Sequence, residues 1–290
     1  MAERKPWRAV VSALRPHQWP KNLLLFAGIV FAAKIDDWSR WLEAGAVFVA
    51  YCAASSAAYL INDVRDAPQD RLHPVKRERA IARGELAPAR ALQLAALLGV
   101  LAFGLAAVLG LGSLLYLGLF SGLQVAYTLG LKRVVLVDVL VIAGLFVLRA
   151  AAGAEAVDVR ISPWLLVCTA LLALFLGLVK RRGELVLVGA EETPGRPVLE
   201  GYSLRLVDRL VAVVAVATVV SYTLYALTAR DSKAMAVTVP FVVFGVVRYL
   251  VLVHRHGLGE EPERVLLTDW PIIVAVALWV LTAAAVLVWI

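Results

Sequence analysis

The stretch NDVRDAPQD, residues 62–70, places an asparagine and three aspartates at the end of a long apolar segment. On a helix, Asn62, Asp66 and Asp70 recur every four residues, and Asp63 joins Asp66 and Asp70 at spacings of three and seven. All four polar groups can therefore share one face. Three carboxylates this close repel one another, so at neutral pH they need cations or raised pKa values. Mg²⁺ is the natural cation, because it binds through one or two carboxylates and leaves positions for water and substrate phosphates.

A proline interrupts this acidic stretch. In a continuing helix the ring of Pro68 would clash with the carbonyl of Val64, so we expect the helix to end or kink near Asp66 and Asp70 to lie in a turn. The plain alternative to a metal site is a solvated loop whose acids form local ion pairs. Here, however, the acids begin inside the apolar register, where ionisable groups are costly and usually functional.

Basic residues surround the two charged regions of the chain. Lys76, Arg77 and Arg79 follow the aspartates closely enough to hold phosphate oxygens that a metal does not cover. A second charged stretch, GLVKRRGELVLVG, contains one acid among three basic residues: Lys180, Arg181, Arg182 and Glu184. Such a basic stretch can bind anionic oxygens directly, but it lacks the aspartates that would hold a magnesium cluster.

Four other polar residues are candidates at the same membrane edge. Lys21 and Asn22 stand at the headgroup boundary of a short apolar segment, where a contact to a lipid phosphate is slightly favoured over simple snorkelling. Tyr127 and Lys132 lie near the end of another apolar segment. For Lys132, ordinary anchoring by positive charge explains the residue about as well as a substrate role does.

The composition is that of an integral membrane protein. Hydrophobic residues make up 61% of the chain and charged residues 18%, and the mean hydropathy is +0.81. A bilayer core about 30 Å thick needs roughly 20 apolar residues per helix. Segments of about that length lie near residues 42–61, 91–109, 112–131, 134–153, 163–179, 208–228, 236–253 and 271–290. A shorter segment, Leu23 to Ile35, is counted as a ninth span that needs its polar flank within the headgroup layer.

The distribution of positive charge predicts the orientation. With a cytoplasmic N-terminus and nine spans, most of the 29 Lys and Arg residues face the cytoplasm. Few face outside: Lys34, Arg40, Arg149, Arg160, Arg230 and Lys233. We therefore expect a multi-pass plasma-membrane protein with its C-terminus outside and its chemistry on cytoplasmic loops 62–91 and 180–207. Basic loops facing anionic headgroups also account for the net charge of +7 without nucleic acid as a partner.

The N-terminal region differs from the rest of the chain. Residues 1–20 alternate basic and apolar side chains around Trp7 and Trp19, which is typical of a short amphipathic helix at the membrane interface. A disordered basic tail is the alternative. Residues 21–290 are expected to form one transmembrane domain, and its Gly- and Ala-rich helices are compatible with a homo-oligomer without requiring one.

These motifs resemble those of a known family. NDVRDAPQD fits the pattern N-D-x-x-D-x-x-x-D of the UbiA-type intramembrane prenyltransferases, and YTLGLKRVVLVDVL is similar to that family's Tyr-Lys-Asp segment. The resemblance covers essentially the whole chain. It implies an all-α fold of nine transmembrane helices around a central lipid-open cavity that binds magnesium-diphosphate at its cytoplasmic mouth. It also implies Asp63, Asp66 and Asp70 as metal ligands, with Asn62 orienting the metal shell or a diphosphate oxygen.

One motif departs from the pattern of prenyl-transferring members, which generally carry a second aspartate-rich motif after the sixth span. Here KRRGE stands in its place, and together with RPHQWPKN it resembles the bacterial decaprenyl-phosphate phosphoribosyltransferases. That subgroup implies transfer of 5-phosphoribosyl from 5-phosphoribosyl 1-diphosphate (PRPP) to a polyprenyl phosphate. The reaction releases pyrophosphate and leads toward the decaprenyl-phosphoryl arabinose donor of cell-wall arabinan.

Two other functions stay open at this point. One is prenyl transfer from a prenyl diphosphate to an aromatic or quinone acceptor, which the missing second acidic motif disfavours. The other is a membrane transporter, which would place charged residues along a pathway near the bilayer middle, whereas here they gather at one face. Under the phosphoribosyltransferase hypothesis, basic side chains from both charged stretches hold the phosphates of the two substrates.

Overall fold

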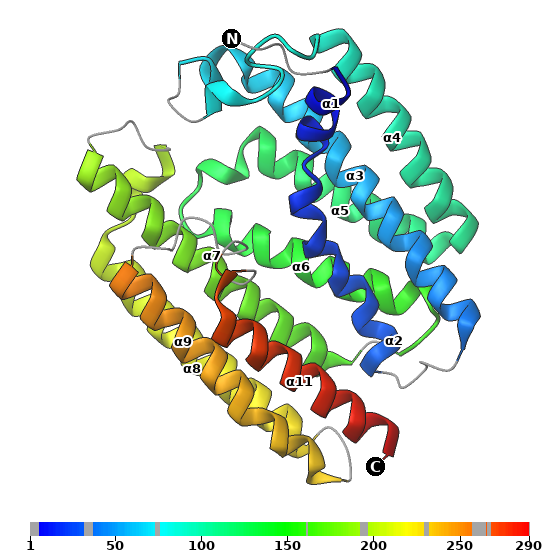
Figure 1. The fold of residues 1–290 in the computed structure, drawn as a ribbon, viewed down its shortest axis with the longest axis vertical. Helices are drawn as coiled ribbons and strands as arrows, with labels where there is room; N and C mark the ends of the chain where they lie inside the picture. The colour runs from blue at the N-terminus through cyan, green and yellow to red at the C-terminus, as the bar shows by residue number, and fades with distance from the viewer. Residues whose placement is uncertain are drawn as a thin grey trace. The chain divides into compact units, whose positions relative to one another are not determined.

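The structure is a computed structural model, and it describes residues 6–31, 37–72, 76–160, 162–191, 197–228, 232–256, 265 and 268–289. Every regular element in these ranges is helical, which confirms the all-α expectation (Figure 1). The chain divides into two compact units. The first unit comprises Met1–Thr128 and Leu148–Arg160, and the second comprises Leu129–Val147 and Ile161–Ile290.

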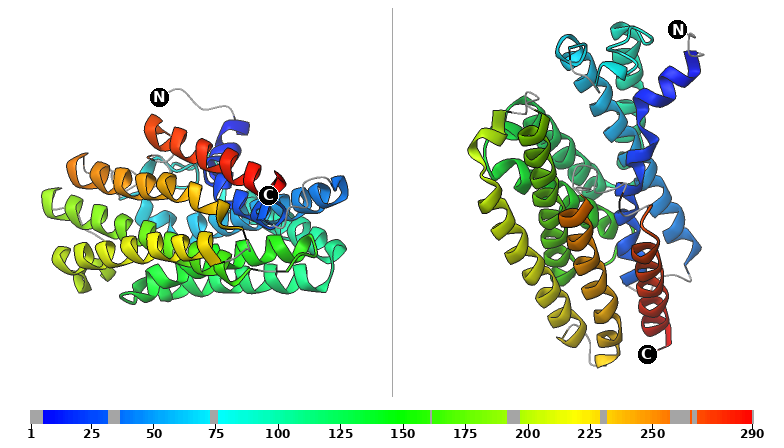
Figure 2. Two further views of the ribbon diagram at one scale, coloured as in Figure 1. Left: turned by 90° about the horizontal axis from the view of Figure 1, so that it is seen from below. Right: turned by 60° about the vertical axis from the view of Figure 1, so that its left-hand side comes forward.

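The first unit is built on a long helix, α3, that carries the acidic stretch at its C-terminal end. The Asp37 side chain caps α3 by accepting a hydrogen bond from the Ser39 backbone N–H at 3.0 Å. The elements of this unit are α1 (Pro6–Leu14), η1 (Pro16–Phe26), α2 (Ala27–Phe31), α3 (Trp38–Asp70), η2 (Lys76–Glu78), α4 (Pro88–Leu109), α5 (Leu111–Leu129) and the second half of α6 (Val137–Ala156). Helix α4 runs alongside α3 (Figures 1 and 2).

Small side chains bring the helices of the first unit together. Ala57 and Ala67 of α3 are buried in one apolar cluster with Ala91 and Ala95 of α4. Without bulky side chains between them, the two backbones can approach closely, which is how helices associate within a membrane. Ala9 of α1 joins the same cluster, so the N-terminal helix packs on the α3–α4 pair.

A second close approach joins the N-terminal segment to α6. A Cβ on Gly153 of α6 would lie 2.0 Å from the carbonyl oxygen of Leu25, and a Cβ on Gly28 of α2 would lie 2.8 Å from the Cα of Ala154. These separations are too short for any side chain. Glycine at both positions therefore permits this backbone-to-backbone contact.

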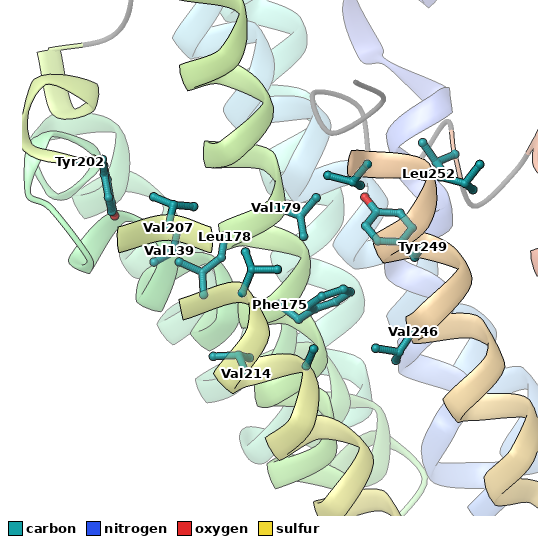
Figure 3. Close-up of a cluster of buried hydrophobic side chains, with 14 of the residues drawn as sticks. Val139, Phe175, Leu178, Val179, Tyr202, Val207, Val214, Val246, Tyr249 and Leu252 are labelled. Carbon is teal, nitrogen blue, oxygen red and sulfur yellow. The ribbon is translucent and has the colours of Figure 1, made fainter. Parts of the chain in front are cut away.

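The second unit has its own apolar core between α7, α8 and α9. Phe175 and Tyr249 pack edge to face with ring centroids 5.7 Å apart, and valines from α6, α7, α8 and α9 belong to the same cluster (Figure 3). The elements of this unit are η3 (Leu131–Arg133), the first half of α6, α7 (Pro163–Glu191), η4 (Pro197–Gly201), α8 (Leu204–Thr228), η5 (Lys233–Thr238), α9 (Val239–His256) and α11 (Trp270–Trp289).

The described helices agree with the predicted spans. Seven are long and apolar enough to cross a membrane: Trp38–Asp70, Pro88–Leu109, Leu111–Leu129, Val137–Ala156, Pro163–Leu187, Leu204–Thr228 and Lys233–His254. The apolar stretch Trp270–Val286 is shorter. Each of the eight long segments expected from the sequence thus coincides with a helix over most of its length in the described ranges. Over Leu23 to Ile35 the structure describes the end of η1 and then α2, and residues 32–36 lie outside the described part, so the count of nine stays a prediction.

Two expected helix ends are wrong. Helix α3 does not end near Asp66 but continues through Pro68, so Asp70 is helical and not in a turn; a kink near Asp66, the alternative to a helix end, stays a prediction. Pro68 stands in the last turn, where its missing N–H deprives only the carbonyl of Val64, and the Arg71 N–H still donates to Ala67 at 3.2 Å. Helix α7 likewise runs on past residue 179, because Lys, Arg, Glu and Leu are good helix formers. Hydropathy locates the edge of an apolar segment and not the end of its helix.

Candidate active site

Two buried aspartates at the end of α3 form the centre of a charged cluster in the first unit. Asp63 and Asp70 stand seven residues apart on one helical face, with side chains only 5% and 6% exposed. Arg15 and Arg79 supply the opposite charge. We refer to Arg15, Asp63, Asp70 and Arg79 as the aspartate–arginine cluster.

The two arginines bind these carboxylates differently. Nη2 of Arg15 donates to both oxygens of Asp63, at 2.7 and 2.9 Å. Nη1 of Arg79 lies between the two acids, 3.0 Å from Oδ1 of Asp63 and 2.7 Å from Oδ2 of Asp70. Two positive and two negative charges therefore balance formally in a poorly solvated place, where an uncompensated charge would be costly.

A compact turn after η2 holds Arg79 in position. Ala80 and Ile81 are buried against the apolar cluster of α3 and α4. The N–H groups of Glu85 and Leu86 both donate to the carbonyl of Ala80, at 2.9 and 3.2 Å. The turn closes at Gly84, whose φ of 77° favours glycine. Arg79 therefore projects from a folded turn toward the aspartates.

Arg15 reaches the cluster from the junction between α1 and η1. Its backbone is left-handed, with φ 54° and ψ 60°, a conformation that costs a non-glycine residue roughly 1–2 kcal/mol. Ser56 of α3 ties down both sides of the junction, because its Oγ donates to the Leu14 carbonyl at 2.9 Å and accepts from Nε1 of Trp19 at 3.1 Å. The Arg15 guanidinium also lies 4.7 Å from the ring centroid of Tyr59.

The other two polar residues of the acidic stretch pair with each other. Nδ2 of Asn62 donates to Oδ2 of Asp66 at 3.0 Å, and both side chains are half-buried. The expected single polar face is thus divided into two adjacent pairs, with Asp63 and Asp70 facing inward and Asn62 and Asp66 beside them. Asp66 is more exposed than Asp63 and Asp70, so its carboxylate is the more accessible to a ligand.

The remaining candidates of the first unit lie in different surroundings. Arg77 is on the surface, with its side chain 64% exposed and a loose ion pair to Glu78 at 3.8 Å. Lys76 is half-buried, and so is Tyr127 near the end of α5. Lys21 donates to Oε1 of Gln18 at 2.5 Å.

Asn22 takes part in an internal polar contact. Its amide donates to the Cys52 sulfur at 3.2 Å and accepts from Nε of Arg149 at 2.7 Å. Arg149 is buried as well, and its guanidinium lies 4.6 Å from the ring centroid of Phe120. Asn22 therefore links η1 to α3 and α6 inside the unit, while its expected contact to a lipid phosphate stays a prediction.

The second unit contains another buried ionic cluster, which we refer to as the Asp138–Arg181 cluster: Asp138, Arg181, Glu184 and Tyr202. Nε of Arg181 donates to Oδ2 of Asp138 at 2.5 Å, and its Nη1 pairs with Glu184 one turn further along α7. The side chains of Arg181 and Asp138 are 1% and 0% exposed. Arg181 thus binds two carboxylates of its own chain from within the protein.

Tyr202 completes this cluster from the segment before α8. Its hydroxyl donates to Oδ1 of Asp138 at 2.6 Å and accepts from the Leu136 backbone N–H at 2.7 Å. Burial, and then the hydrogen bond to Asp138, raise the pKa of Tyr202 well above its usual range. The phenol therefore stays protonated and continues to donate to Asp138 throughout the physiological pH range.

The other candidate basic residues of the second unit have different surroundings. Nε of Arg182 donates to Oδ1 of Asp208 on α8 at 2.6 Å, so consecutive arginines of α7 serve different partners. Lys180 is half-buried one residue earlier in the helix, and Lys132 is half-buried in η3. The structure thus separates the roles of Lys180, Arg181 and Arg182, which the sequence presents as one basic stretch.

The chemistry of the first unit suits magnesium. Asp63, Asp66 and Asp70 offer carboxylate oxygens and Asn62 an amide oxygen, which are the hard donors that Mg²⁺ prefers. In the described ranges, however, no three His, Cys, Asp or Glu side chains are gathered in a metal-binding arrangement. Guanidinium groups hold Asp63 and Asp70, so a bound cation would compete with Arg15 and Arg79 for the same oxygens.

Three residues of these clusters were not among those predicted from the sequence: Arg15, Asp138 and Tyr202. Arg15 is the first residue of RPHQWPKN, so its motif was visible although its partner was not. Asp138 is an acid in the first turn of an apolar helix, a position that also indicated a role. Tyr202 had no such signal, because a tyrosine at the start of a helix is compatible with many environments.

The chain is similar in sequence to known proteins of one family. Residues 23–268 match the UbiA prenyltransferase family, and the chain belongs to that family. The chain is 33% identical to the decaprenyl-phosphate phosphoribosyltransferase of Mycolicibacterium smegmatis over 95% of its own length and 91% of that protein. It is 34% identical to the enzyme of the same name from Mycobacterium tuberculosis, with 95% and 93% covered, and 33% identical to that of Corynebacterium glutamicum, with 93% and 84% covered.

Solved structures support the fold. A UbiA homologue from Archaeoglobus fulgidus bound to GPP and Mg²⁺ superposes with a TM-score of 0.73, covering 97% of this chain and all of that one, at 17% identity. The same homologue bound to Cd²⁺ gives a TM-score of 0.70 at 16% identity, with the same coverage. The arrangement of helices is therefore the UbiA arrangement, and divalent metals bind to proteins of this fold.

Proposed function

We propose that this protein transfers the 5-phosphoribosyl group of PRPP to a polyprenyl phosphate, decaprenyl phosphate in the first instance, and releases pyrophosphate. The observation that carries the proposal is its 33% identity, over nearly the full length of both chains, to a decaprenyl-phosphate phosphoribosyltransferase. By analogy with that name, the product would serve as a precursor of the decaprenyl-phosphoryl arabinose used for cell-wall arabinan.

The second unit supports this choice over prenyl transfer. A second metal site would need available carboxylates in the region of KRRGE, yet three acids described there already bind guanidinium groups: Asp138 and Glu184 bind Arg181, and Asp208 binds Arg182. A fixed guanidinium between Asp138 and Glu184 leaves no place for a second cation without breaking a buried ion pair. One metal-binding cluster agrees with a single diphosphate leaving group on a soluble sugar donor.

The reaction needs no nucleophile from the protein. An oxygen of the lipid phosphate forms a bond to the anomeric carbon of the ribose as the bond from that carbon to the diphosphate oxygen breaks, and the electron pair leaves with pyrophosphate. Positive charge develops on the ribose ring and negative charge on the leaving group. Catalysis would therefore come from positioning the two substrates and from stabilising the leaving group.

The residues of the chain would divide these tasks. Asp63, Asp66 and Asp70 would hold Mg²⁺, and Asn62 would orient its shell or a diphosphate oxygen. A magnesium ion bound there would neutralise charge developing on the leaving diphosphate. Phosphate oxygens would be held by basic side chains from both charged stretches: Lys76, Arg77, Arg79, Lys180 and Arg182. Arg181 would support the site from within the protein by holding Asp138 and Glu184. Lys21, Asn22, Tyr127, Lys132 and Glu184 complete the proposed substrate contacts.

The proposal includes a membrane arrangement. Nine spans would surround a central cavity open to lipid, with the N-terminus and the active site on the cytoplasmic side and the C-terminus outside. Helix α1 would lie at the interface, which agrees with the exposure of Trp7 and Val11 on its outer side. A homo-oligomer is compatible with the small-residue helix surfaces, and mass measurement of the detergent complex would test it.

A lipid-transfer assay tests the function. Purified protein with radiolabelled PRPP, decaprenyl phosphate and Mg²⁺ is expected to produce label that extracts into organic solvent. The same preparation with a labelled prenyl diphosphate and an aromatic acceptor serves as the comparison. Activity on the prenyl diphosphate, with no labelled lipid from PRPP, would reject the phosphoribosyltransferase in favour of a prenyltransferase.

A further inference from the structure

Arg15 contacts one of the predicted metal ligands, Asp63, which lies 48 residues away in the chain. It makes two hydrogen bonds to that aspartate, and both come from a single nitrogen, Nη2. A guanidinium binds a carboxylate or phosphate most strongly through two parallel bonds from two nitrogens. Arg15 and Asp63 thus form an ion pair that is weaker than the two-nitrogen arrangement.

The attachment of Arg15 leaves its side chain able to change partner. Hydrogen bonds of Ser56 fix the backbone on both sides of the residue, at Leu14 and through Trp19. The side chain itself is 20% exposed, whereas that of Asp63 is 5% exposed. The backbone of Arg15 is therefore held in place, while its side chain is more accessible to an entering ligand than the carboxylate that it binds.

The charge balance determines what happens when a cation and a diphosphate enter. A Mg²⁺ ion bound at Asp63 and Asp70 adds two positive charges to a cluster that Arg15 and Arg79 already neutralise. The metal and the guanidinium groups then compete for the same oxygens, and a guanidinium displaced without a new acceptor would be costly. A diphosphate arriving with the metal supplies anionic oxygens and so restores the balance.

We propose that Arg15 is a phosphate-binding residue that rests on Asp63 in the empty site and transfers its guanidinium to the diphosphate when the magnesium-diphosphate binds. The inference rests on the proposed function only in requiring a diphosphate substrate. Tyr59, which stacks on the guanidinium, lies on the same face of α3 one turn before Asp63 and would support the side chain in either position.

The exchange predicts effects of opposite sign on metal and on diphosphate. In Arg15→Gln, Asp63 loses a competing counter-ion, so Mn²⁺ should bind to the protein alone about 3- to 10-fold more tightly. Inorganic pyrophosphate with saturating Mg²⁺ should bind about 10- to 100-fold more weakly, because a charged hydrogen-bond donor to phosphate is lost. Arg15→Lys keeps the positive charge but loses the paired N–H donors of the guanidinium. Its affinities for Mn²⁺ and for pyrophosphate should lie between those of the wild type and of Arg15→Gln.

The experiment uses the full chain purified in detergent, with Mn²⁺ binding followed by electron paramagnetic resonance and pyrophosphate binding by calorimetry. The matched control is Arg8→Gln on the same N-terminal segment, because Arg8 is exposed and its guanidinium lies 5.3 Å from the ring centroid of Trp7. This control should leave both affinities unchanged. Melting temperatures of all variants establish that each protein is folded.

Two outcomes would overturn the inference. Unchanged pyrophosphate affinity in Arg15→Gln would mean that the guanidinium never reaches the diphosphate. Weaker Mn²⁺ binding in the same variant would mean that Arg15 helps to form the acidic site and does not compete with the metal. If Arg15→Gln fails to fold, the same two criteria apply to Arg15→Lys. Since pyrophosphate probes any diphosphate donor, these results are independent of whether the lipid-transfer assay supports PRPP or a prenyl diphosphate.

Discussion

At the scale of single residues, the charged motifs of the two units differ in how deeply their side chains are buried. Asp66 is half-buried and accepts a hydrogen bond from the neutral amide of Asn62. Arg181 is enclosed and bound to two carboxylates. Residues that look equally available in the sequence therefore differ in what their substitution should change, namely ligand binding in the first case and stability in the second.

Asp66→Ala should abolish turnover together with Mg²⁺-dependent PRPP binding, because it removes a proposed metal ligand. The melting temperature should change less than in Arg181→Ala, since the Asp66 side chain is half-buried and not enclosed. Gln69→Ala, an exposed site in the last turn of α3, is the control for the helix itself. Turnover and calorimetric PRPP binding measure the effect, and wild-type rates in Asp66→Ala would show that the acidic stretch is not the metal site.

Arg181→Ala should destabilise the protein severely. Removing one partner of a buried ion pair costs about 3–5 kcal/mol, and here two acids, Asp138 and Glu184, lose their cation. Arg182→Ala should cost much less, because its partner Asp208 is 38% exposed and can be solvated. Thermal unfolding in detergent compares the two variants, and equal melting temperatures would contradict the structural role assigned to Arg181.

At the scale of elements, close backbone contacts decide how the first unit is assembled. The N-terminal segment that carries Arg15 packs through α1 on α3 and continues through η1 and α2 to α6. Its contact with α6 depends on glycine, because a Cβ at Gly153 would meet the Leu25 carbonyl. Since a backbone atom cannot move aside as a flexible side chain can, this contact should be intolerant of even one methyl group.

Gly153→Ala should therefore lower the melting temperature, with a cost of at least about 1–3 kcal/mol from overpacking. Gly118→Ala on α5 is the matched control, because a Cβ there meets no heavy atom within 4 Å. This control should be neutral or slightly stabilising, since alanine has the higher helix propensity. The idea fails if both variants melt at the same temperature.

At the scale of the whole molecule, membrane topology connects these elements to the cell. Helix α3 has 33 residues, which makes it about 50 Å long and sufficient to cross the bilayer and carry the acidic stretch beyond the apolar core. Positive charge concentrated on the loops that follow α3 and α7 predicts that both lie in the cytoplasm. The proposed site would then face a soluble sugar donor on one side and lipid on the other.

Cysteine labelling tests this topology. In a variant whose two native cysteines are replaced, Arg77→Cys, at a side chain 64% exposed, should react with a membrane-impermeant maleimide only after the cells are opened. Trp38→Cys, at the other end of α3 and 73% exposed, should react in intact cells. The opposite pattern would place the acidic stretch outside and remove access to cytoplasmic PRPP.

The sequence alone determined the membrane class, the eight long apolar segments, the acidic stretch and the basic motif, because hydropathy and spacing are local properties that the chain carries wherever it packs. Its errors were also local, at Pro68 and after residue 179, where an apolar segment ended before its helix did. Only the tertiary structure decided which charges meet. Arg15 lies on Asp63 because α1 packs against α3, and Arg181 turns inward because α6 and the segment before α8 place Asp138 and Tyr202 beside α7. Such partners are separated by tens of residues, and their pairing depends on helix packing that no spacing along the chain encodes.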